Sequence, residues 1–231
     1  MQRIDKYLSN LGLISRKDSN KFFKNNLLLV NNIIIKNKDF KVNFGDIITF
    51  LDQKIEVLEH IYILLNKPTG YVSSQVDEGG HKSFKHLLKN CIYKDLLHVV
   101  GRIDFDTTGF LLLTNNGDFT HNIINPKKNI FKKYLVNSEF ELSKEDINKL
   151  ISGVIIDGEI TSTAKVEVIS KNTIYLSISQ GKFHQVKKMF EAINNKVISL
   201  KRVAIGNLEL GDLKEGEWRY LNQDEIKKLF C

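Results

Sequence analysis

The sequence predicts an α+β protein with two domains. A chain of 231 residues suits one larger domain and one small one, and a hydrophobic fraction of 42% is enough to fill real cores. Segments with the two-residue alternation of strands and segments with helical spacing are mixed, without the repeated strand–helix–strand order of parallel α/β folds. We therefore expect a small unit over residues 1–58, followed over residues 59–231 by a mixed, largely antiparallel sheet flanked by helices.

The first unit combines helical spacing with short apolar runs and turn residues. Apolar positions three and four apart predict helices, and asparagine or glycine between apolar runs predicts tight turns. The expected elements are a helix over 3–12, a helix over 16–25, two short strands over 27–36 around a turn at Asn31-Asn32, and a strand over 46–51.

Basic residues are concentrated in this unit. Residues 1–45 contain nine lysines or arginines and three aspartates, a net charge of +6, whereas the whole chain carries +7. Arg16 and Lys17 stand at the start of the second expected helix, where free backbone amides also favour anions. A solvated helix face explains such a charge cluster about equally well, so charge alone does not decide.

The second unit alternates strand and helix signals without an internal repeat. Strands are expected over 61–67, 71–74, 96–100, 110–115, 132–140, 163–170, 173–179, 197–210 and 216–221. Helices are expected over 84–90 after a Ser83 cap, 117–124, 144–153, 184–193 and 224–230.

Composition narrows the class of protein. A basic excess, 34 Lys and Arg against 27 Asp and Glu, predicts attraction to polyanions, most often nucleic acid. The start of the chain lacks a secretory signal and no apolar run reaches spanning length, so we expect no membrane association. The cysteines, Cys91 and Cys231, and the scattered histidines lack metal-type spacing. We expect a cytoplasmic protein without metal or redox cofactor.

Charged residues stand directly before the most apolar run of the chain. Arg102, Asp104 and Asp106 precede Phe110–Leu113, and glycines at 101 and 109 bound the stretch that holds them. This pattern predicts a loop between two central strands, a place where rigid scaffolds present reactive side chains. Composition alone favours a surface ion pair between Arg102 and either aspartate by about two to one.

Two stretches resemble known families. "RIDKYLSNLGLISRKDSNKFFKNNLLLVNNIIIK" is similar to the small RNA-binding domain first seen in ribosomal protein S-four, with Asn32 in place of the usual turn glycine. That resemblance implies that a set of residues faces structured RNA, namely Arg3, Lys6, Ser15, Arg16 and Lys17.

"GRIDFDTTGFLLLTNNGDF" resembles the catalytic signature of the pseudouridine synthases that modify ribosomal RNA, the RsuA family. "LLNKPTGYVSS", "KKYLV" and "SQGKFHQVKKMF" match further blocks of that family in the same order. The resemblance covers nearly the whole chain and is greatest to the small-subunit branch of the family. It implies a uridine isomerase of small-subunit rRNA that requires no cofactor, since the reaction changes neither composition nor oxidation state.

The resemblance also implies roles for individual residues. The catalytic set is Asp104 as the carboxylate that acts on the sugar, Lys187 as the cation that keeps it ionised, and Tyr134 against the flipped uracil. The substrate-binding set is Arg102 in the nucleotide stack, Ile178 beside the uracil, Lys67 on the catalytic loop or RNA, and Lys182 and His184 at a phosphate. Asp106 receives only a structural role.

Other functions remain open at this stage. Large-subunit rRNA enzymes share the same motifs, and a noncatalytic RNA-binding ribosome-assembly factor would retain the same fold. A hydrolase would use Asp104 and Asp106 as its two carboxylates, but it leaves the RNA-binding unit unexplained. We expect a monomer whose partner is ribosomal RNA, either naked or within a partly assembled small ribosomal subunit.

Overall fold

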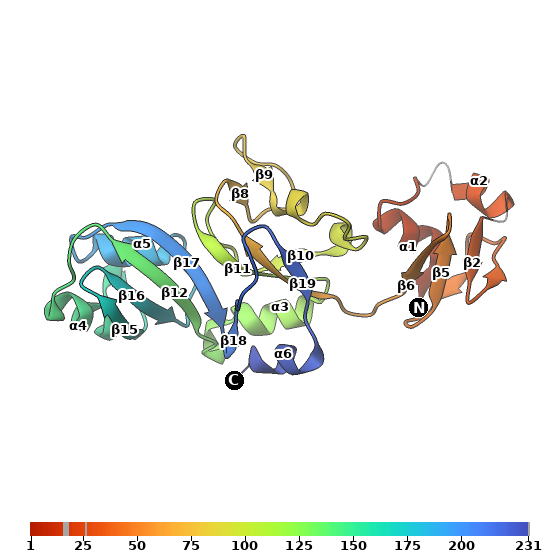
Figure 1. The fold of residues 1–231 in the computed structure, drawn as a ribbon. Coiled ribbons are helices and arrows are strands. Elements are labelled where there is room, and N and C mark those ends of the chain that lie inside the picture. The colour runs from red at the N-terminus through yellow and green to blue at the C-terminus, as the bar shows by residue number, and fades with distance from the viewer. Residues whose placement is uncertain (16–18, 26, 231) are drawn as a thin grey trace. The chain divides into compact units, whose positions relative to one another are not determined.

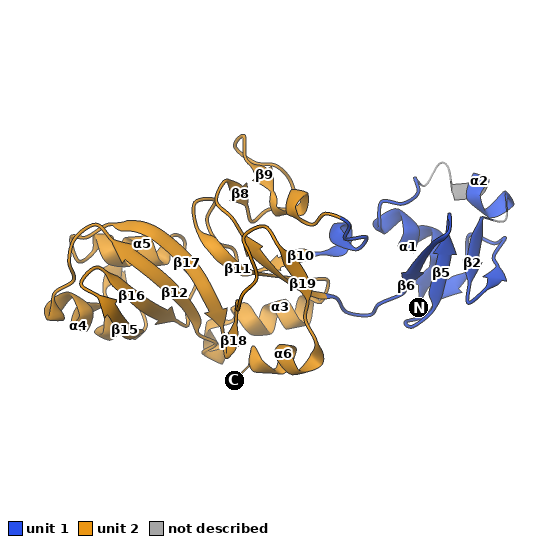
Figure 2. Cartoon of the chain, viewed as in Figure 1, with its two compact units in different colours: residues 1–61, 90–97 blue, residues 62–89, 98–231 orange. Residues whose placement is uncertain are grey.

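The chain folds into two compact units. The computed structural model describes residues 1–15, 19–25 and 27–230. One unit comprises Met1–Ile61 together with Asn90–Leu97, and the other comprises Tyr62–Lys89 and His98–Cys231 (Figure 2). Of the helices in the described ranges, none is long and apolar enough to cross a membrane.

The smaller unit is built from short elements around its own core. Its elements are β1 (Gln2–Arg3), α1 (Ile4–Asn10), α2 (Ser19–Lys24), β2 (Leu28–Val30), β3 (Ile33–Ile34), β4 (Lys41–Val42), β5 (Ile47–Phe50), β6 (Gln53–Glu56) and the 3₁₀ turn η2 (Lys94–Leu96). Strands β3, β2, β5 and β6 form an antiparallel sheet in that order, and β1 pairs with β4. Ile4, Tyr7 and Leu8 of α1 are buried, as their helical spacing predicts.

The expected turn between β2 and β3 is present. Asn31 and Asn32 have φ values of 50° and 67°, the left-handed conformation that a two-residue hairpin of this type requires. The Asn31 side chain reinforces the turn, because its Oδ1 accepts a hydrogen bond from the Ile47 amide at 2.9 Å. Asparagine therefore replaces glycine here without loss of the hairpin.

A later segment completes the smaller unit. Asn90–Leu97 joins the residues of Met1–Ile61, and its Tyr93 hydroxyl donates a hydrogen bond to the Glu56 carbonyl at 2.9 Å. The unit thus extends beyond the expected range of 1–58. It includes Asn90–Leu97, which lies within the range of 59–231 expected for the other unit. Contact between segments more than thirty residues apart leaves no local sequence signal, so the boundary could not be read from composition.

The larger unit contains one long mixed sheet. Its elements are β7 (Tyr62–Lys67), β8 (Tyr71–Val72), β9 (Lys82–Ser83), η1 (Phe84–Leu87), β10 (His98–Val100), β11 (Thr108–Thr114), α3 (Gly117–Ile124), η3 (Pro126–Lys128), β12 (Lys132–Ser138), α4 (Lys144–Ser152), β13 (Ile155–Ile156), β14 (Glu159–Ile160), β15 (Lys165–Ser170), β16 (Thr173–Ile178), α5 (Gln185–Glu191), β17 (Val197–Ile205), β18 (Leu208–Glu209), β19 (Trp218–Tyr220) and α6 (Gln223–Lys228). The strand order is β15-β16-β12-β17-β11-β7-β19, with β10 beside β11 and β18 beside β17 (Figure 1). The expected α+β class and largely antiparallel sheet are confirmed.

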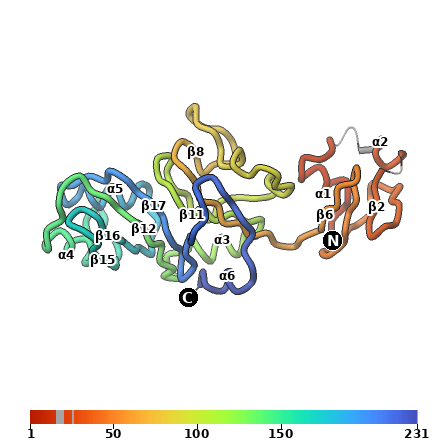
Figure 3. Tube along the Cα trace, viewed as in Figure 1, coloured from red at the N-terminus to blue at the C-terminus, as the bar shows by residue number. Residues whose placement is uncertain are grey.

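Strands β11 and β17 join the two halves of this sheet. They pair in parallel through Thr108 with Lys201 and Gly109 with Arg202, whereas β12 pairs with β17 in the antiparallel sense. The trace in Figure 3 shows β17 running between β12 and β11. The loop before β11 therefore lies next to residues about a hundred positions later in the chain.

Each half of the sheet has its own apolar core. In one half, Leu150 of α4 and Val186, Met189 and Phe190 of α5 pack with buried residues of β12 and β16. In the other half, Phe119 and Ile123 of α3 pack with buried residues of β7 and β11. The pocket described below is lined from both halves.

Candidate active site

A pocket in the larger unit gathers residues from distant parts of the chain. Its walls come from the loop between β10 and β11, from the segment between β16 and α5 with the first residues of α5, and from β12 and β17. The empty space between these residues amounts to about 440 Å³, a figure that includes space open to solvent. The predicted site residues that line it are Arg102, Asp104, Tyr134, Ile178, Lys182, His184 and Lys187.

A buried arginine fixes both ends of the loop that carries Asp104. Arg202 is 2% exposed, and its Nε and one terminal amine donate to the Phe110 and Gly101 carbonyls at 2.8 and 2.9 Å. Gly109 allows β11 to approach β17 here, since an added Cβ would lie 2.2 Å from the Arg202 carbonyl oxygen. Residues 101–110 are thus held at their two ends by one guanidinium.

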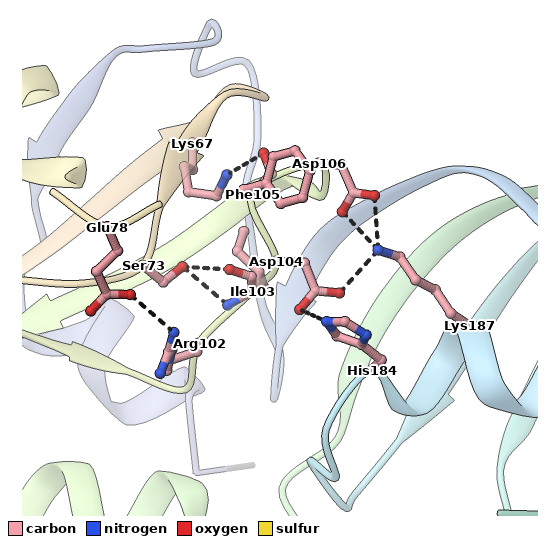
Figure 4. Close-up of polar contacts among 10 residues, drawn as sticks. All are labelled: Lys67, Ser73, Glu78, Arg102, Ile103, Asp104, Phe105, Asp106, His184 and Lys187. Carbon is pink, nitrogen blue, oxygen red and sulfur yellow. Dashed lines mark hydrogen bonds and ion pairs between the residues drawn. The ribbon is translucent and has the colours of Figure 1, made fainter. Parts of the chain in front are cut away.

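Lys67 supports the same loop through hydrogen bonds to backbone carbonyls. The side chain is fully buried, and its ammonium donates to the carbonyls of Pro68, Tyr71 and Phe105 at 2.9, 2.8 and 3.4 Å (Figure 4 draws the contact to Phe105). These contacts favour the expected support of the catalytic loop over a direct contact of Lys67 with RNA. Burial lowers the pKa of Lys67 to about 8, although the charges of Asp106 and Asp104 act in the opposite direction.

Ser73 holds the middle of the loop. Its hydroxyl donates to the Ile103 carbonyl at 2.6 Å and also lies 3.2 Å from the Ile103 amide, as Figure 4 shows. These contacts fix the backbone directly before Asp104. Preorganised loops of this kind hold a reactive group in place without an ordering cost at the moment of reaction.

Lys187 lies between two aspartates of the loop. Its Nζ is 3.2 Å from Oδ2 of Asp104 and 2.7 and 2.9 Å from the two oxygens of Asp106 (Figure 4). The expected closeness of Lys187 to Asp104 is present. Asp106 has a supporting position, in line with the structural role expected for it, because it holds the lysine that faces Asp104.

The electrostatics of this cluster favour a charged lysine. Burial alone would lower the pKa of Lys187, but the hydrogen bond to Asp106 and the charge of Asp104 outweigh it, so this pKa lies above its ordinary value. One ammonium therefore offsets two carboxylates. The side chain of Asp104 is 26% exposed and faces the pocket, which leaves it open to a substrate.

Two apolar or aromatic residues form the wall beside Asp104. Tyr134 lies on β12 opposite Leu176 and Arg202, and Ile178, at the end of β16, is 3% exposed. Both line the pocket, as predicted from the motifs. A planar base inserted beside Asp104 would meet one aromatic and one aliphatic side chain.

Polar residues at the rim already have partners. The Arg102 guanidinium is 74% exposed and lies 3.9 Å from Glu78, so the expected surface pairing with Asp104 or Asp106 is not what the structure places there. Lys182 forms an ion pair with Glu159, and His184 Nε2 is 3.5 Å from Asp104 Oδ1. Binding of phosphate by Lys182 would compete with that carboxylate.

The predicted RNA-binding residues of the smaller unit differ in their surroundings. Arg3 is exposed but engaged, with Asp5 and Asp39 at 2.7 and 2.6 Å, whereas the exposed Lys6 has an ion pair with neither. Ser15 is exposed. Arg16 and Lys17 lie outside the described residues.

Sequence reasoning missed Arg202 and the contact of Asp106 with Lys187. A signal for Arg202 exists, because it stands in phase with buried Leu200 and Ala204 on β17, an inward position where an arginine is unusual.

Thr107 was also missed. It is 1% exposed beside the pocket, and its hydroxyl has no hydrogen-bond partner among the residues described. Within residues 1–15, 19–25 and 27–230, no group of histidine, cysteine or acidic side chains is arranged to hold a metal ion.

Comparison with known proteins accounts for both units. The family model described as RNA pseudouridylate synthase matches residues 61–192, and the S4 domain model matches residues 2–48. A crystal structure described as a pseudouridylate synthase has a TM-score of 0.70 and 35% identity, covering 99% of this chain and 100% of that one.

Two relatives extend over nearly the full chain. The ribosomal small subunit pseudouridine synthase A of Vibrio vulnificus is 35% identical, covering 99% of this chain and 99% of the relative. The ribosomal large subunit pseudouridine synthase B of Bacillus subtilis is 35% identical, covering 99% and 96%. The chain belongs to the RNA pseudouridine synthase family, whose members are isomerases, and it carries an S4 domain before the synthase domain.

Proposed function

We propose that this protein isomerises uridine to pseudouridine in the RNA of the small ribosomal subunit. The observation that carries the chemistry is the Asp104 carboxylate, held in a pocket with Lys187 at 3.2 Å. The rRNA target is supported by the relatives named for small-subunit and large-subunit enzymes. The signature "GRIDFDTTG" resembles the small-subunit branch and favours that target.

The reaction requires a carboxylate at the sugar and a base outside its stack. The bond between C1′ and N1 of the uridine breaks, the uracil turns, and a bond forms between C1′ and C5. The proton on C5 is lost and N1 gains one, so the product has the atoms of the substrate. Asp104 serves this exchange either by bonding to C1′ or by taking the proton of C2′, and both routes use the same ionised oxygen.

The other pocket residues divide the remaining tasks. Lys187 stabilises the carboxylate form of Asp104, and Asp106 keeps that lysine in place. Tyr134 and Ile178 receive the uracil between an aromatic and an apolar wall. Arg102, exposed at the rim, contacts the strand from which the uridine is drawn. Arg202 and Lys67 do not touch substrate but position the loop.

The smaller unit supplies affinity for folded RNA. Lys6, Ser15, Arg16 and Lys17 contact RNA in this proposal, and affinity falls as salt rises because phosphate contacts release counterions. Arg3 contributes less, since two carboxylates already hold its guanidinium. The protein acts as a cytoplasmic monomer on ribosomal RNA, either naked or within a partly assembled small subunit.

Chemical mapping of pseudouridine in both rRNAs tests the proposal. Purified protein is incubated with 16S and 23S rRNA transcripts, and with partly assembled particles of each subunit, beside the variant Asp104→Asn. We expect one new pseudouridine in 16S rRNA with the wild type, and a loss of rate of at least about 10³-fold in the variant with RNA binding retained. Product in 23S rRNA alone would establish the large-subunit alternative. Equal product from the variant would overturn the assignment of Asp104.

The noncatalytic alternative predicts a different pattern. An assembly factor would bind the particles without forming pseudouridine in any of them. The same mapping experiment therefore separates the two functions, because binding is measured on the same samples.

A further inference from the structure

An exposed aromatic side chain stands beside the pocket. Phe183 is 71% exposed, and its ring stacks on the His184 ring with centroids 3.7 Å apart and planes at 21°. His184 in turn lines the pocket and lies 3.5 Å from Asp104. A single exposed phenylalanine needs no explanation by itself, but this one rests on a residue of the site.

The backbone around Phe183 is held in place. Gln185 is buried, its side-chain oxygen accepts the Lys182 amide at 2.9 Å, and its own amide donates to the Lys182 carbonyl at 3.2 Å. His184 adopts the left-handed conformation with φ 52°, which is uncommon for a residue with a side chain. The turn 182–185 therefore presents the Phe183 ring without the freedom of an ordinary surface loop.

The charges near this ring do not favour phosphate. Lys188 lies 5.4 Å from the ring centroid but pairs with Asp157 at 2.6 Å, and Lys182 pairs with Glu159. Both lysines are thus offset by carboxylates. Phe183 itself remains 71% exposed, and its apolar ring suits contact with a base better than contact with a phosphate backbone.

Removal of a uridine from its stack leaves the neighbouring bases without a partner. Enzymes that act on single-stranded RNA commonly replace that partner with an aromatic ring, because every base has a face that stacks. Consecutive nucleotides are joined by a single phosphodiester link, so the nucleotide next to a uridine bound at Asp104 must lie close to the pocket rim. His184 connects that rim directly to Phe183.

We propose that Phe183, backed by His184, is a stacking platform for the unpaired base next to the uridine that enters the pocket. The inference rests on the proposed function, because it assumes that RNA is drawn into this site. It adds a contact that selects single-stranded RNA on one side of the target. Loss of the ring weakens RNA binding and leaves the chemistry at Asp104 intact.

Four proteins test the platform: the wild type, Phe183→Ala, Phe183→Trp, and Phe140→Ala as a matched control. Phe140 is also an exposed phenylalanine of this unit, at 58%, but it does not line the pocket. Single-turnover formation of pseudouridine in 16S rRNA transcript is followed over a range of protein concentrations, and the Kd for the transcript is measured in parallel.

We expect Phe183→Ala to raise the half-saturating concentration and the Kd about tenfold, with a maximal rate within about twofold of wild type. Phe183→Trp restores both values and Phe140→Ala changes neither. Equal Kd values for wild type and Phe183→Ala overturn the platform, as does an equal loss in the alanine and tryptophan variants. A wild type that forms no pseudouridine refutes the proposed function instead, and the platform is then judged on the Kd values alone.

A synthetic RNA locates the base. Once the target uridine is mapped, the nucleotide on its 5′ side or on its 3′ side is replaced by an abasic one. On one of these two RNAs, Phe183→Ala has no further effect on Kd. An undiminished effect of Phe183→Ala on both RNAs shows that the ring contacts something other than a neighbouring base.

Discussion

The two units differ in whether any of their described basic side chains are buried. In the smaller unit, Arg3 and Lys6 are exposed, and Arg3 pairs with carboxylates that are also at the surface. In the larger unit, Lys67, Lys132 and Arg202 are buried, and the hydrogen bonds described for them all end on backbone carbonyls. The first arrangement suits adjustable contacts with a polyanion, and the second suits a loop that must not move.

Burial of these cations has a cost that hydrogen bonds to carbonyls and, for Lys67, the nearby charges of Asp106 and Asp104 partly offset. Burial lowers the pKa of both Lys67 and Lys132 to about 8, which reports how much the charged form loses away from water. Three of the carbonyls that receive a bond, those of Gly101, Phe105 and Phe110, belong to residues 101–110, which include Asp104. The difference teaches that the catalytic unit uses buried charge for geometry, whereas the smaller unit uses exposed charge for attraction.

The largest effect on stability and on rate is expected from Arg202→Met. The substitution leaves the Gly101 and Phe110 carbonyls without their donor, at about 1–3 kcal/mol for each buried acceptor. We expect a lower unfolding temperature and a fall in maximal rate of about 100-fold, because Asp104 is displaced with its loop. Urea unfolding and single-turnover kinetics measure the two effects.

Two further variants separate position from charge. Arg202→Lys keeps the charge but lacks the planar fork that reaches both carbonyls, so it should recover stability better than rate. Arg219→Met removes a partly exposed arginine of β19 and serves as the control. A full rate in Arg202→Met would show that the ends of the loop need no clamp.

A smaller effect is expected in the smaller unit. Lys6→Gln should raise the Kd for 16S rRNA several-fold and reduce the salt dependence of log Kd by about one contact, with no change in maximal rate. Arg3→Gln should change Kd less, since its charge is already offset by Asp5 and Asp39. Lys171→Gln, an exposed lysine of the larger unit, is the control. A greater loss from Arg3→Gln than from Lys6→Gln would contradict this ranking.

The last prediction concerns the pH dependence of stability. The pKa of Lys67 is about 8 in the folded protein and 10.5 ordinarily, so between these values the unfolded chain binds more protons. The contribution of Lys67 to stability therefore rises with pH over this window and is lost as pH falls through about 8. We expect the free energy of unfolding of wild type to rise relative to Lys67→Met from pH 8 to 10, by less than about 1.4 kcal/mol per pH unit.

Urea titrations at several pH values measure this difference. Lys54→Met, which removes an exposed lysine of β6, should show no such slope relative to wild type. A difference between wild type and Lys67→Met that is constant from pH 8 to 10 would mean that burial does not perturb Lys67.

Local patterns in the sequence predicted most elements of the fold. Alternation gave β12 and β16, and the serine before α4 forms the expected capping box with Asp146. These features depend on neighbours in the chain, which is why they can be read from it. The attachment of Asn90–Leu97 to the smaller unit depends on Glu56, far away in the sequence, and could not be read.

The candidate site was predicted by motif and not by physics. The resemblance selected Asp104, Tyr134 and Lys187, and the structure brings all three to one pocket. It could not show that Lys187 lies closer to Asp106 than to Asp104, because that depends on how α5 meets the loop. It left Lys67 between support of the loop and contact with RNA, because only the packed structure reveals the three carbonyls around its ammonium.

The parallel pairing of β11 with β17 limits how a nucleotide can gain access to the cavity. Thr108 and Gly109 of β11 pair through their backbone with β17, and the two strands approach each other closely at Gly109. The two halves of the sheet cannot separate at this point without breaking the backbone hydrogen bonds between β11 and β17. We therefore expect a base to enter by rotation of exposed side chains at the pocket rim, such as Arg102 and His184, and not by opening of the sheet.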